Sequence, residues 1–357
     1  MKTKESCSCL STCNNCASLL RSDDKTNKYQ GLEVPLPFEE RELLREALAS
    51  KVIPNPIDNN LDTLSHIIRG SQRCYQFLPE YMHRQLLQMR LGTFNPSYYL
   101  VRGLPIDEDL PATPLDGSWN PNKKTFISEA LLLGIGSMLG FPFGFAKEKD
   151  GRLVNQISPI PGKEETQSSA SATTLLGYHT EIAYEDNLRP RFLLLVCLRQ
   201  DREKTARTNI VDMRNVLRNL PNWAIQELRK HQFQFKVPDS FSNSTIWAAP
   251  KPILSGPLSN PEVVYDAKAC KLIYHTETGS LALKLLQVEV NKPEYCQAIE
   301  LTLGDLLIIP NYFTVHGRSS FVPRFDGHDR WLVRVYVTDS IFKNRQDMTE
   351  NLLVFGK

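Results

Sequence analysis

Two side chains of the kind that bind metal ions stand two residues apart at the end of a short apolar run. They are His179 and Glu181, within residues 175–182. On a β-strand, residues i and i+2 project from the same face, so both side chains could bind one ion. A second histidine would complete a 2-His-1-carboxylate site, which leaves positions on Fe(II) open for a co-substrate and O2. Alone the pair is weak support, because a chain with 7 histidines can contain such a triplet by chance.

A candidate for the missing ligand, His316, stands much further along the chain. Residues 306–309 (Leu-Leu-Ile-Ile) predict a buried strand that breaks at Pro310 and Asn311, and His316 follows in the run Thr-Val-His-Gly-Arg. A histidine among apolar residues is more often a core side chain with one hydrogen bond than a metal ligand. Both interpretations of His316 therefore stay open on this pattern alone.

Two arginines, Arg330 and Arg334, share one face of another predicted strand. They stand four residues apart in Arg-Trp-Leu-Val-Arg, and an even spacing places both on the same side. Burying two cations is costly unless each meets an anion. Two carboxylate ligands would meet this demand, because arginine binds a carboxylate through a bidentate pair of hydrogen bonds. The alternative is a pair of ordinary ion pairs with acids elsewhere in the chain, on an exposed face.

Together these features resemble the clavaminate synthase-like branch of the Fe(II)/2-oxoglutarate-dependent oxygenases, in the TauD-like superfamily. That branch includes hydroxylases of free arginine, asparagine and lysine. The matching elements occur in order along the chain: His179-x-Glu181, His316 within the run 304–318, then Arg330 and Arg334. The resemblance covers residues 130–340 approximately and leaves out residues 1–30.

The resemblance implies a metal site and a co-substrate site. His179, Glu181 and His316 would ligate Fe(II), with 2-oxoglutarate and O2 as the co-substrates. Arg330 matches the arginine that holds the distal carboxylate of 2-oxoglutarate in the family, and Thr208 is implied as a hydroxyl partner there.

The resemblance also implies how an amino-acid substrate would be held. Arg334 matches the arginine that takes the substrate α-carboxylate, and Ser169 matches a serine that contacts the same group. Glu181 would accept a hydrogen bond from the substrate ammonium through its free oxygen. Glu148 stands where some relatives have a polar contact to the substrate.

One departure from the family concerns the substrate side chain. Where arginine hydroxylases carry acids that hold the guanidinium group, this chain has Lys268 and Cys270, and Asp266 is the only acid nearby. The departure argues against arginine as the substrate and leaves the side-chain specificity open.

The implied reaction is hydroxylation of an unactivated C–H bond of a free or carrier-bound amino acid, with 2-oxoglutarate decarboxylated to succinate and CO2. The same cofactors also support desaturation, ring formation or epoxidation, or a peptide side chain as substrate. Halogenation is disfavoured, because halogenases of this superfamily lack the carboxylate ligand that Glu181 supplies. An alternative from another class is a non-catalytic jelly-roll binding module with structural histidines and arginines.

The elements around these residues predict a mostly β fold with flanking helices. Helical patterns run over about 38–48, 60–70, 78–91, 123–140, 212–219, 221–231 and 279–291, and strand patterns over 97–103, 192–198, 297–301, 306–309 and 331–337. Many short strands with peripheral helices indicate a double-sheet core, a jelly roll or double-stranded β-helix. The Ser/Thr-rich residues 155–174 are a candidate lid over the site.

Composition narrows the class of protein. The chain has 357 residues, 41% of them hydrophobic, and a net charge of +2, so no nucleic-acid or membrane surface is expected. Neither a secretory signal nor an apolar run of membrane-spanning length is evident, which favours a cytoplasmic protein.

We expect a disordered, reduced tail over 1–30 and a single domain over 31–357. The tail contains Cys7, Cys9, Cys13 and Cys16, whose spacing fits no known zinc site. Oligomeric state cannot be read from the sequence.

Overall fold

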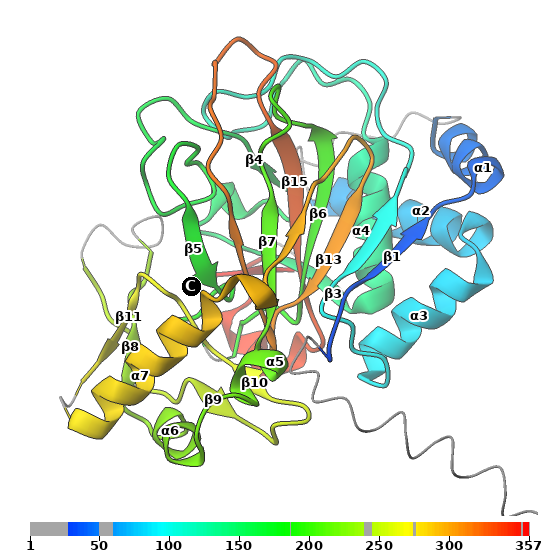
Figure 1. Cartoon of the computed structure of the whole chain (residues 1–357). Helices are drawn as coiled ribbons and strands as arrows, with labels where there is room; N and C mark the ends of the chain where they lie inside the picture. The colour runs from blue at the N-terminus through cyan, green and yellow to red at the C-terminus, as the bar shows by residue number, and fades with distance from the viewer. Residues whose placement is uncertain are drawn as a thin grey trace, which may run out of the picture.

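Two β-sheets face each other and carry helices on their outer sides (Figure 1). The computed structural model describes residues 28–49, 60–185, 187–238, 245–273, 276–350 and 353–356. The four clustered cysteines of the predicted tail lie outside these residues. Tyr29 already belongs to the packed chain, because its backbone N–H and C=O both bond the Asn215 side chain, at 3.1 and 2.9 Å.

The larger sheet has eight strands and contributes the arginine strand of the site. Along the sheet they are β1 (Leu32–Pro35), β2 (Tyr99–Arg102), β13 (Leu306–Pro310), β6 (Phe192–Arg199), β15 (Trp331–Thr338), β3 (Phe141–Phe145) and β16 (Val354–Phe355), with β4 (Asn155–Ile157) also paired to β15. The central pairs β13–β6 and β6–β15 are antiparallel. The pairs β1–β2 and β3–β16 are parallel, so both ends of the described chain are held in this sheet.

The smaller sheet has four antiparallel strands and contributes the histidines. Its order is β12 (Gln297–Ile299), β7 (Thr208–Asp212), β14 (Thr314–Arg318) and β5 (Leu176–His179). In the β14–β5 pair, His316 stands directly opposite His179. The register of this sheet therefore brings together two residues 137 positions apart.

Alternation along the strands decides what each face of the larger sheet contacts. In β6, Leu194 and Val196 pack toward the helices, whereas Leu193 and Leu195 pack between the two sheets. The cluster between the sheets also includes Ile210 of β7. Its apolar side chains exclude water below the site and hold the two sheets at a fixed separation.

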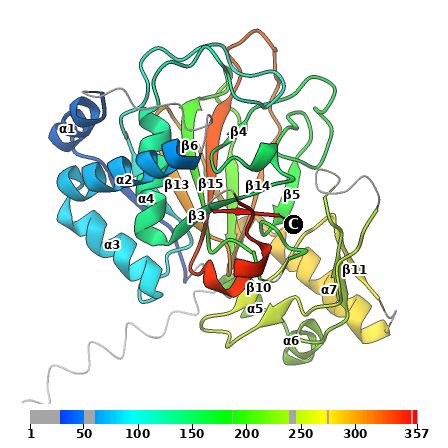
Figure 2. The ribbon, with the colours of Figure 1, turned by 180° about the vertical axis from the view of Figure 1, so that it is seen from behind.

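Four helices cover the outer face of the larger sheet (Figures 1 and 2). They are α1 (Phe38–Ala49), α2 (Asn60–Phe77), α3 (Glu80–Leu91) and α4 (Ile127–Leu139). α4 is buried along almost its whole length, and it crosses α2 at Gly134 and Gly70. A Cβ on Gly134 would lie only 2.4 Å from the carbonyl carbon of Gly70, so the close crossing requires glycine.

Other helices and two pairs of short strands cover the outer side of the smaller sheet. These are α5 (Met213–Leu217), α6 (Asn222–Leu228), α7 (Glu277–Val290), the 3-10 turn η2 (Pro293–Tyr295), and the antiparallel pairs β9 (Leu254–Ser255) with β10 (Glu262–Val263) and β8 (Phe233–Phe235) with β11 (Cys270–Leu272). They pack on Val211 and Val315, which alternate with the residues that face the other sheet. The 3-10 turns η1 (Lys149–Gly151) and η3 (Phe342–Asp347) instead lie next to β3 and β16 of the larger sheet. None of the described helices is both long and apolar enough to cross a bilayer.

The predicted helices and strands are present, with shifted ends. α4 begins at Ile127 instead of near residue 123, because Asp107 caps it from a distant loop and accepts hydrogen bonds from the Ile127 and Ser128 amides. Lys123 instead lies in a buried ion cluster with Asp107 and Glu129, at 2.8 and 2.6 Å. Short strands such as β1, β7 and β8 were not predicted, since each is held by long-range pairing more than by its own pattern.

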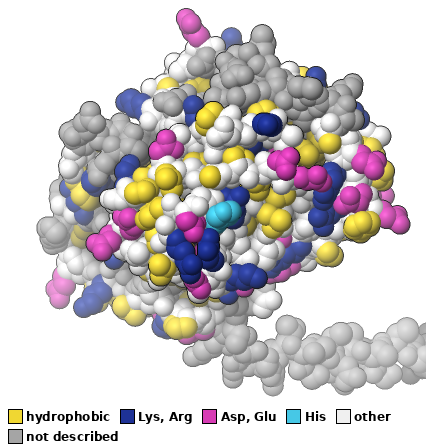
Figure 3. Space-filling view, turned by 90° about the horizontal axis from the view of Figure 1, so that it is seen from above, with side chains coloured by type: hydrophobic (Ala, Val, Ile, Leu, Met, Phe, Trp, Pro, Cys, Tyr) yellow, Lys and Arg dark blue, Asp and Glu magenta, His cyan; other side chains and the backbone are white. Residues whose placement is uncertain are grey.

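Charged side chains on the molecular surface are of mixed sign. In the view from above, the largest group of lysines and arginines has acidic side chains on both sides (Figure 3). Charges of both signs are therefore interspersed on this face.

Candidate metal centre and active site

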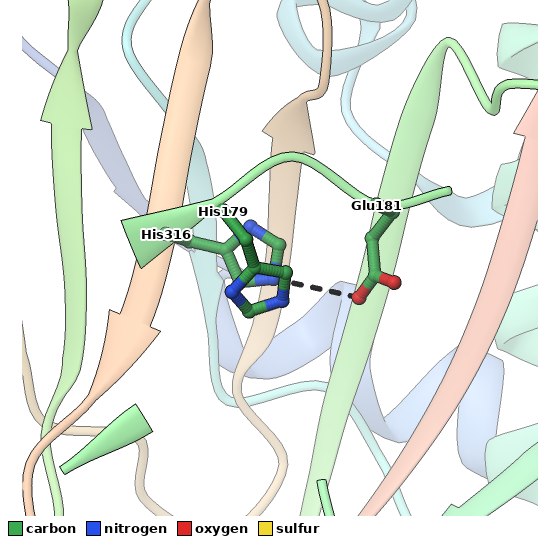
Figure 4. Close-up of side chains that lie close together, drawn as sticks. All are labelled: His179, Glu181 and His316. Carbon is green, nitrogen blue, oxygen red and sulfur yellow. Dashed lines mark ion pairs between the residues drawn. The ribbon is translucent and has the colours of Figure 1, made fainter. Parts of the chain in front are cut away.

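Three side chains with metal-binding groups converge between the two sheets. His179 ends β5, Glu181 follows it, and His316 lies in the middle of β14. One ligand atom from each lies within 4.8 Å of the other two. Figure 4 shows the two imidazole rings side by side, with the Glu181 carboxylate directed toward them. The Nε2 atom of His316 is 3.4 Å from Oε1 of Glu181.

The backbone at Glu181 is fixed by an asparagine from another strand end. The Asn311 side chain accepts a hydrogen bond from the Glu181 amide at 2.8 Å and donates one to the Glu181 carbonyl at 3.1 Å. Asn311 itself is fully buried. The next residue, Ile182, has a φ of +56°, which is strained for a β-branched residue. At this strained turn the chain leaves the smaller sheet, directly after Glu181. A strained backbone persists only where surrounding contacts hold it, and here the two hydrogen bonds from Asn311 do so.

Hydrogen bonding orients the histidine rings. Nδ1 of His179 is 2.9 Å from the carbonyl oxygen of Gly177, and the carbonyl requires a proton on that nitrogen. Nε2 of His179 therefore keeps its lone pair for a metal ion. Burial, together with the neighbouring His179, lowers the pKa of His316. A lowered pKa favours the neutral ring, the form that binds metals.

Two side chains from β15 contact the Glu181 carboxylate. Tyr336 donates a hydrogen bond to Oε2 at 3.0 Å, and Nη1 of Arg334 lies 3.7 Å from Oε1. Burial opposes ionisation of Glu181, but Arg334 and the two histidines more than offset it and hold the pKa of this carboxyl well below its usual range. Arg334 also forms an ion pair with Glu148, whose other oxygen is buried without a partner.

The three residues fit a divalent metal ion of the first transition row. Ligand atoms bound about 2.1 Å from one ion at right angles lie about 3 Å apart, close to the separation of His316 and Glu181. Two neutral imidazoles and one carboxylate form the donor set of the 2-His-1-carboxylate triad. All three residues also line a cavity of the protein.

The larger sheet contributes a second cation that lacks an acid partner. Arg330 is 7% exposed, and its one hydrogen bond to a described residue goes to the hydroxyl of Thr208 at 3.4 Å. No carboxylate of the described residues pairs with it, so burial lowers the pKa of Arg330. A buried guanidinium without an acid provides a binding site for a carboxylate ligand.

Comparison with known proteins identifies the family. Residues 124–336 match the family described as taurine catabolism dioxygenase TauD, TfdA family. The chain belongs to the TauD/TfdA dioxygenase family. The matched span contains all three candidate metal ligands and both Arg330 and Arg334.

Several characterised relatives within the TauD/TfdA family act on amino acids or related compounds, by their names. The chain is 33% identical to L-asparagine oxygenase of Streptomyces coelicolor over 88% of this chain and 91% of that protein. It is 33% identical to clavaminate synthase 2 of Streptomyces clavuligerus over 70% of this chain and 78% of that protein. A crystal structure of asparagine oxygenase in complex with Fe(II), 2S,3S-3-hydroxyasparagine and succinate superposes with a TM-score of 0.81, at 32% identity, over 91% of this chain and 99% of that one.

One cavity of about 820 Å³ is lined by all the candidate ligand-binding residues predicted from the sequence. The volume lies within the range of about 300–1,000 Å³ that is typical of small-molecule sites. Its lining includes the metal ligands, the co-substrate candidates and the substrate candidates: His179, Glu181, His316, Arg330, Thr208, Arg334, Ser169, Glu148 and Asp266. The structure thus brings these residues together in one cavity, while the roles assigned to individual side chains stay predictions.

The substrate candidates differ in how they are held. Ser169 is exposed on the loop that borders the cavity. Asp266 stands opposite His179 in an isolated β-bridge, and its Oδ1 accepts hydrogen bonds from the Lys268 and Ala269 amides, at 2.9 and 2.8 Å. Asp266 therefore serves at least in part to shape the turn before β11.

Three residues that shape the site had no assigned role in the sequence reasoning. They are Asn311, Tyr336 and Arg318. Tyr336 follows Arg334 by two positions on the same strand, so the alternation used for the arginines would have placed it at the site. Arg318 anchors the end of the candidate lid, since its guanidinium donates to Ser171 and to the Thr174 carbonyl, the latter at 2.9 Å.

Proposed function

We propose that this protein is an Fe(II)/2-oxoglutarate-dependent oxygenase that hydroxylates an unactivated C–H bond of a free amino acid. One observation carries the proposal: the cluster of His179, Glu181 and His316 opens into the same cavity as the buried Arg330, which has no acid partner among the described residues. A metal site beside an empty carboxylate site is what a metal-chelating dicarboxylate co-substrate needs. The similarity to L-asparagine oxygenase supports an amino acid as the substrate.

The metal and its co-substrates supply the oxidising chemistry. When bound, Fe(II), 2-oxoglutarate and O2 together remove a hydrogen atom from the substrate and return a hydroxyl group, with succinate and CO2 as by-products. His179, Glu181 and His316 would hold the metal on one side and leave adjacent positions open toward the cavity. Arg330, with the Thr208 hydroxyl, would bind the distal carboxylate of 2-oxoglutarate and so fix its orientation.

The substrate would be held by complementary charges next to the metal. Arg334 would bind the α-carboxylate, and the Ser169 hydroxyl would add a hydrogen bond at the border of the cavity. In this structure Glu148 is paired with Arg334, so an incoming α-carboxylate joins or replaces that ion pair. The free oxygen of Glu181 already accepts from Tyr336, and its second lone pair is the acceptor for the substrate ammonium.

The fold that we propose for this chain is a double-stranded β-helix, or jelly roll, within a single domain over residues 31–357. Two mainly antiparallel sheets enclose the site, and both the first and the last described strands belong to the larger one. The residues 155–174 that border the cavity would act as its lid. Because Arg318 fixes residues 171–174, closure would involve residues 162–169. Protease sensitivity of these residues should fall when iron, 2-oxoglutarate and substrate are added, and unchanged sensitivity counts against the lid.

The experiment that tests the function is a survey of amino acids for substrate-dependent succinate release. We expect one amino acid or a few to stimulate release in the presence of Fe(II), 2-oxoglutarate and O2, with a product heavier by one oxygen atom. His179→Ala and Glu181→Ala should abolish the stimulated release. Retained turnover in these variants would refute the proposal, and a product lighter by two hydrogens would indicate desaturation or ring formation instead.

A further inference from the structure

Lysine side chains surround the cavity that contains the metal centre. They come from four separate segments: Lys147 and Lys149 near η1, Lys163 in the loop after β4, Lys236 after β8, and Lys268 before β11. Segments so far apart in the sequence meet only in the folded protein. The wall around the site is therefore strongly basic, although the whole chain has a net charge of only +2.

The acids of the cavity wall are already engaged. Glu148 is paired with Arg334, and Glu181 contacts His316, Arg334 and Tyr336. Asp266 accepts hydrogen bonds from two backbone amides through Oδ1. None of these acids forms an ion pair with a lining lysine among the described residues.

The lysines nearest solvent keep their charges unpaired. Within the described part of the chain, Lys147, Lys163 and Lys268 form no ion pair with an acid, whereas Lys149 donates a hydrogen bond to the Gly117 carbonyl at 2.8 Å. Cations that line one low-dielectric cleft reinforce each other and attract an anion into it.

Arg330 and Arg334 do not account for this excess of positive charge. Under the proposed function, Arg330 takes the distal carboxylate of 2-oxoglutarate and Arg334 takes the α-carboxylate of the substrate. The substrate's ammonium lies against Glu181. What remains to face the lysines is the side chain of the substrate. A substrate bound to a carrier as a thioester would have no α-carboxylate for Arg334. We therefore consider a free amino acid, whose side chain would carry the negative charge that faces the lysines.

The stem of Lys268 lies against β5, the strand that ends at His179. A Cβ on Gly177 would be 3.4 Å from Cγ of Lys268, so the aliphatic stem lies against β5. The carbonyl of the same glycine holds the His179 ring. Lys268 also follows Asp266, the residue opposite His179 in the β-bridge, by two positions.

We propose that the substrate is a free amino acid whose side chain ends in an anionic group, and that Lys268 selects this group. The proposal rests on the proposed hydroxylase function and names its substrate class. An anionic side chain would neutralise unpaired lysines, whereas a lysine or arginine side chain would add a cation to a wall in which lysines and arginines outnumber acids. Selection thus acts both by attraction and by repulsion.

The first test compares acids with their amide isosteres. L-Aspartate, L-glutamate and O-phospho-L-serine are titrated by calorimetry into the protein with Fe(II) and 2-oxoglutarate under anaerobic conditions, beside L-asparagine, L-glutamine, L-lysine and L-arginine. We expect at least one anionic amino acid to bind about tenfold more tightly than its neutral counterpart, and the same amino acid to stimulate succinate release most in air. The aspartate and phosphoserine arms distinguish a carboxylate from a phosphate group.

The second test changes the sign of the selecting residue. Lys268→Glu should weaken binding of the preferred anionic amino acid by about tenfold or more, and improve binding of cationic ones. Lys284→Glu is the matched control, because Lys284 is exposed on α7 and does not line the cavity, so it should leave the preference unchanged. Thermal unfolding verifies that both variants fold.

The outcomes separate this inference from the function on which it rests. If an amide or a cationic amino acid is preferred, or if Lys268→Glu leaves the order of preference unchanged, the substrate class is wrong and the hydroxylase function stands. If Fe(II) and 2-oxoglutarate bind but no amino acid stimulates succinate release, the proposed function fails, and the substrate class fails with it.

Discussion

Replacing Arg330 by methionine should have opposite effects on co-substrate binding and on the stability of the ligand-free protein. Arg330 is 7% exposed, and its guanidinium bonds one described hydroxyl, that of Thr208, at the long distance of 3.4 Å. Arg330→Met keeps a side chain of similar length and removes the charge. If Arg330 exists to bind a carboxylate, the variant loses that ligand but no longer has to bury an unpaired cation.

The expected magnitudes follow from these contacts. A hydrogen bond to a charged group contributes about 1.5–3 kcal/mol, which corresponds to about a 10- to 150-fold rise in KM for 2-oxoglutarate. Replacing a buried charged group by an apolar one can stabilise the folded state by about 1–4 kcal/mol. We expect about 1 kcal/mol for Arg330→Met, because Arg330 borders a cavity that water can enter. For a chain of this size that is a rise in Tm of roughly 2 °C without ligand.

The assay combines thermal unfolding without ligands and succinate release over a range of 2-oxoglutarate concentrations. Arg334→Met is the matched control, because Arg334 is paired with Glu148 and lies near Glu181. Its loss leaves two buried acids without their cation, so its Tm should fall where that of Arg330→Met rises. A lower Tm for Arg330→Met together with an unchanged KM for 2-oxoglutarate would refute the reasoning.

Three further predictions concern other parts of the structure. Burial raises the pKa of Glu129, in the ion cluster at the start of α4, to about 7, which is above its value in the unfolded chain. The stability of the folded protein should therefore fall as the pH rises from about 4.5 to 7. Glu129→Gln should flatten this slope when Tm is measured against pH, and an unchanged slope would contradict the assignment. Asn311→Ala removes both backbone bonds to Glu181 and should weaken Fe(II) binding about 10- to 100-fold in an anaerobic titration, with a native affinity as the refuting result. Gly134→Ala should lower the free energy of unfolding by at least about 1–3 kcal/mol, because its Cβ would overlap the backbone of α2; denaturant unfolding with no change in midpoint would disprove this contact.

Two of the three candidate metal ligands and both arginines could be named from the sequence because their spacing is local. Arg330 and Arg334 both line the cavity, as their even spacing predicts, although Arg330 lies one residue before β15. His179 and Glu181 also line the cavity, but β5 ends at His179 and Glu181 stands in the turn that follows, so strand alternation does not account for their relative directions. His316 needed the family resemblance, because nothing in its own segment states that β14 pairs with β5 in the register that places it opposite His179.

What could not be predicted depends on contacts between distant segments. The Asn311 clamp on Glu181 joins residues 130 positions apart, and the Asp107 cap of α4 joins residues 20 and 21 positions apart. The basic wall of the cavity arises from four segments that no sequence pattern links. Strand ends and helix starts shifted for the same reason, since long-range hydrogen bonds set them more than local propensity does.

The most direct test of the central claim is an anaerobic titration of the protein with Fe(II) in the presence of 2-oxoglutarate, followed through the visible charge-transfer absorbance that the chelate gives. Fe(II) bound by His179, Glu181 and His316 predicts one equivalent of iron per chain and an absorbance that disappears in His316→Ala. If His316→Ala develops the same absorbance at the same iron concentration, these three residues do not form the metal centre.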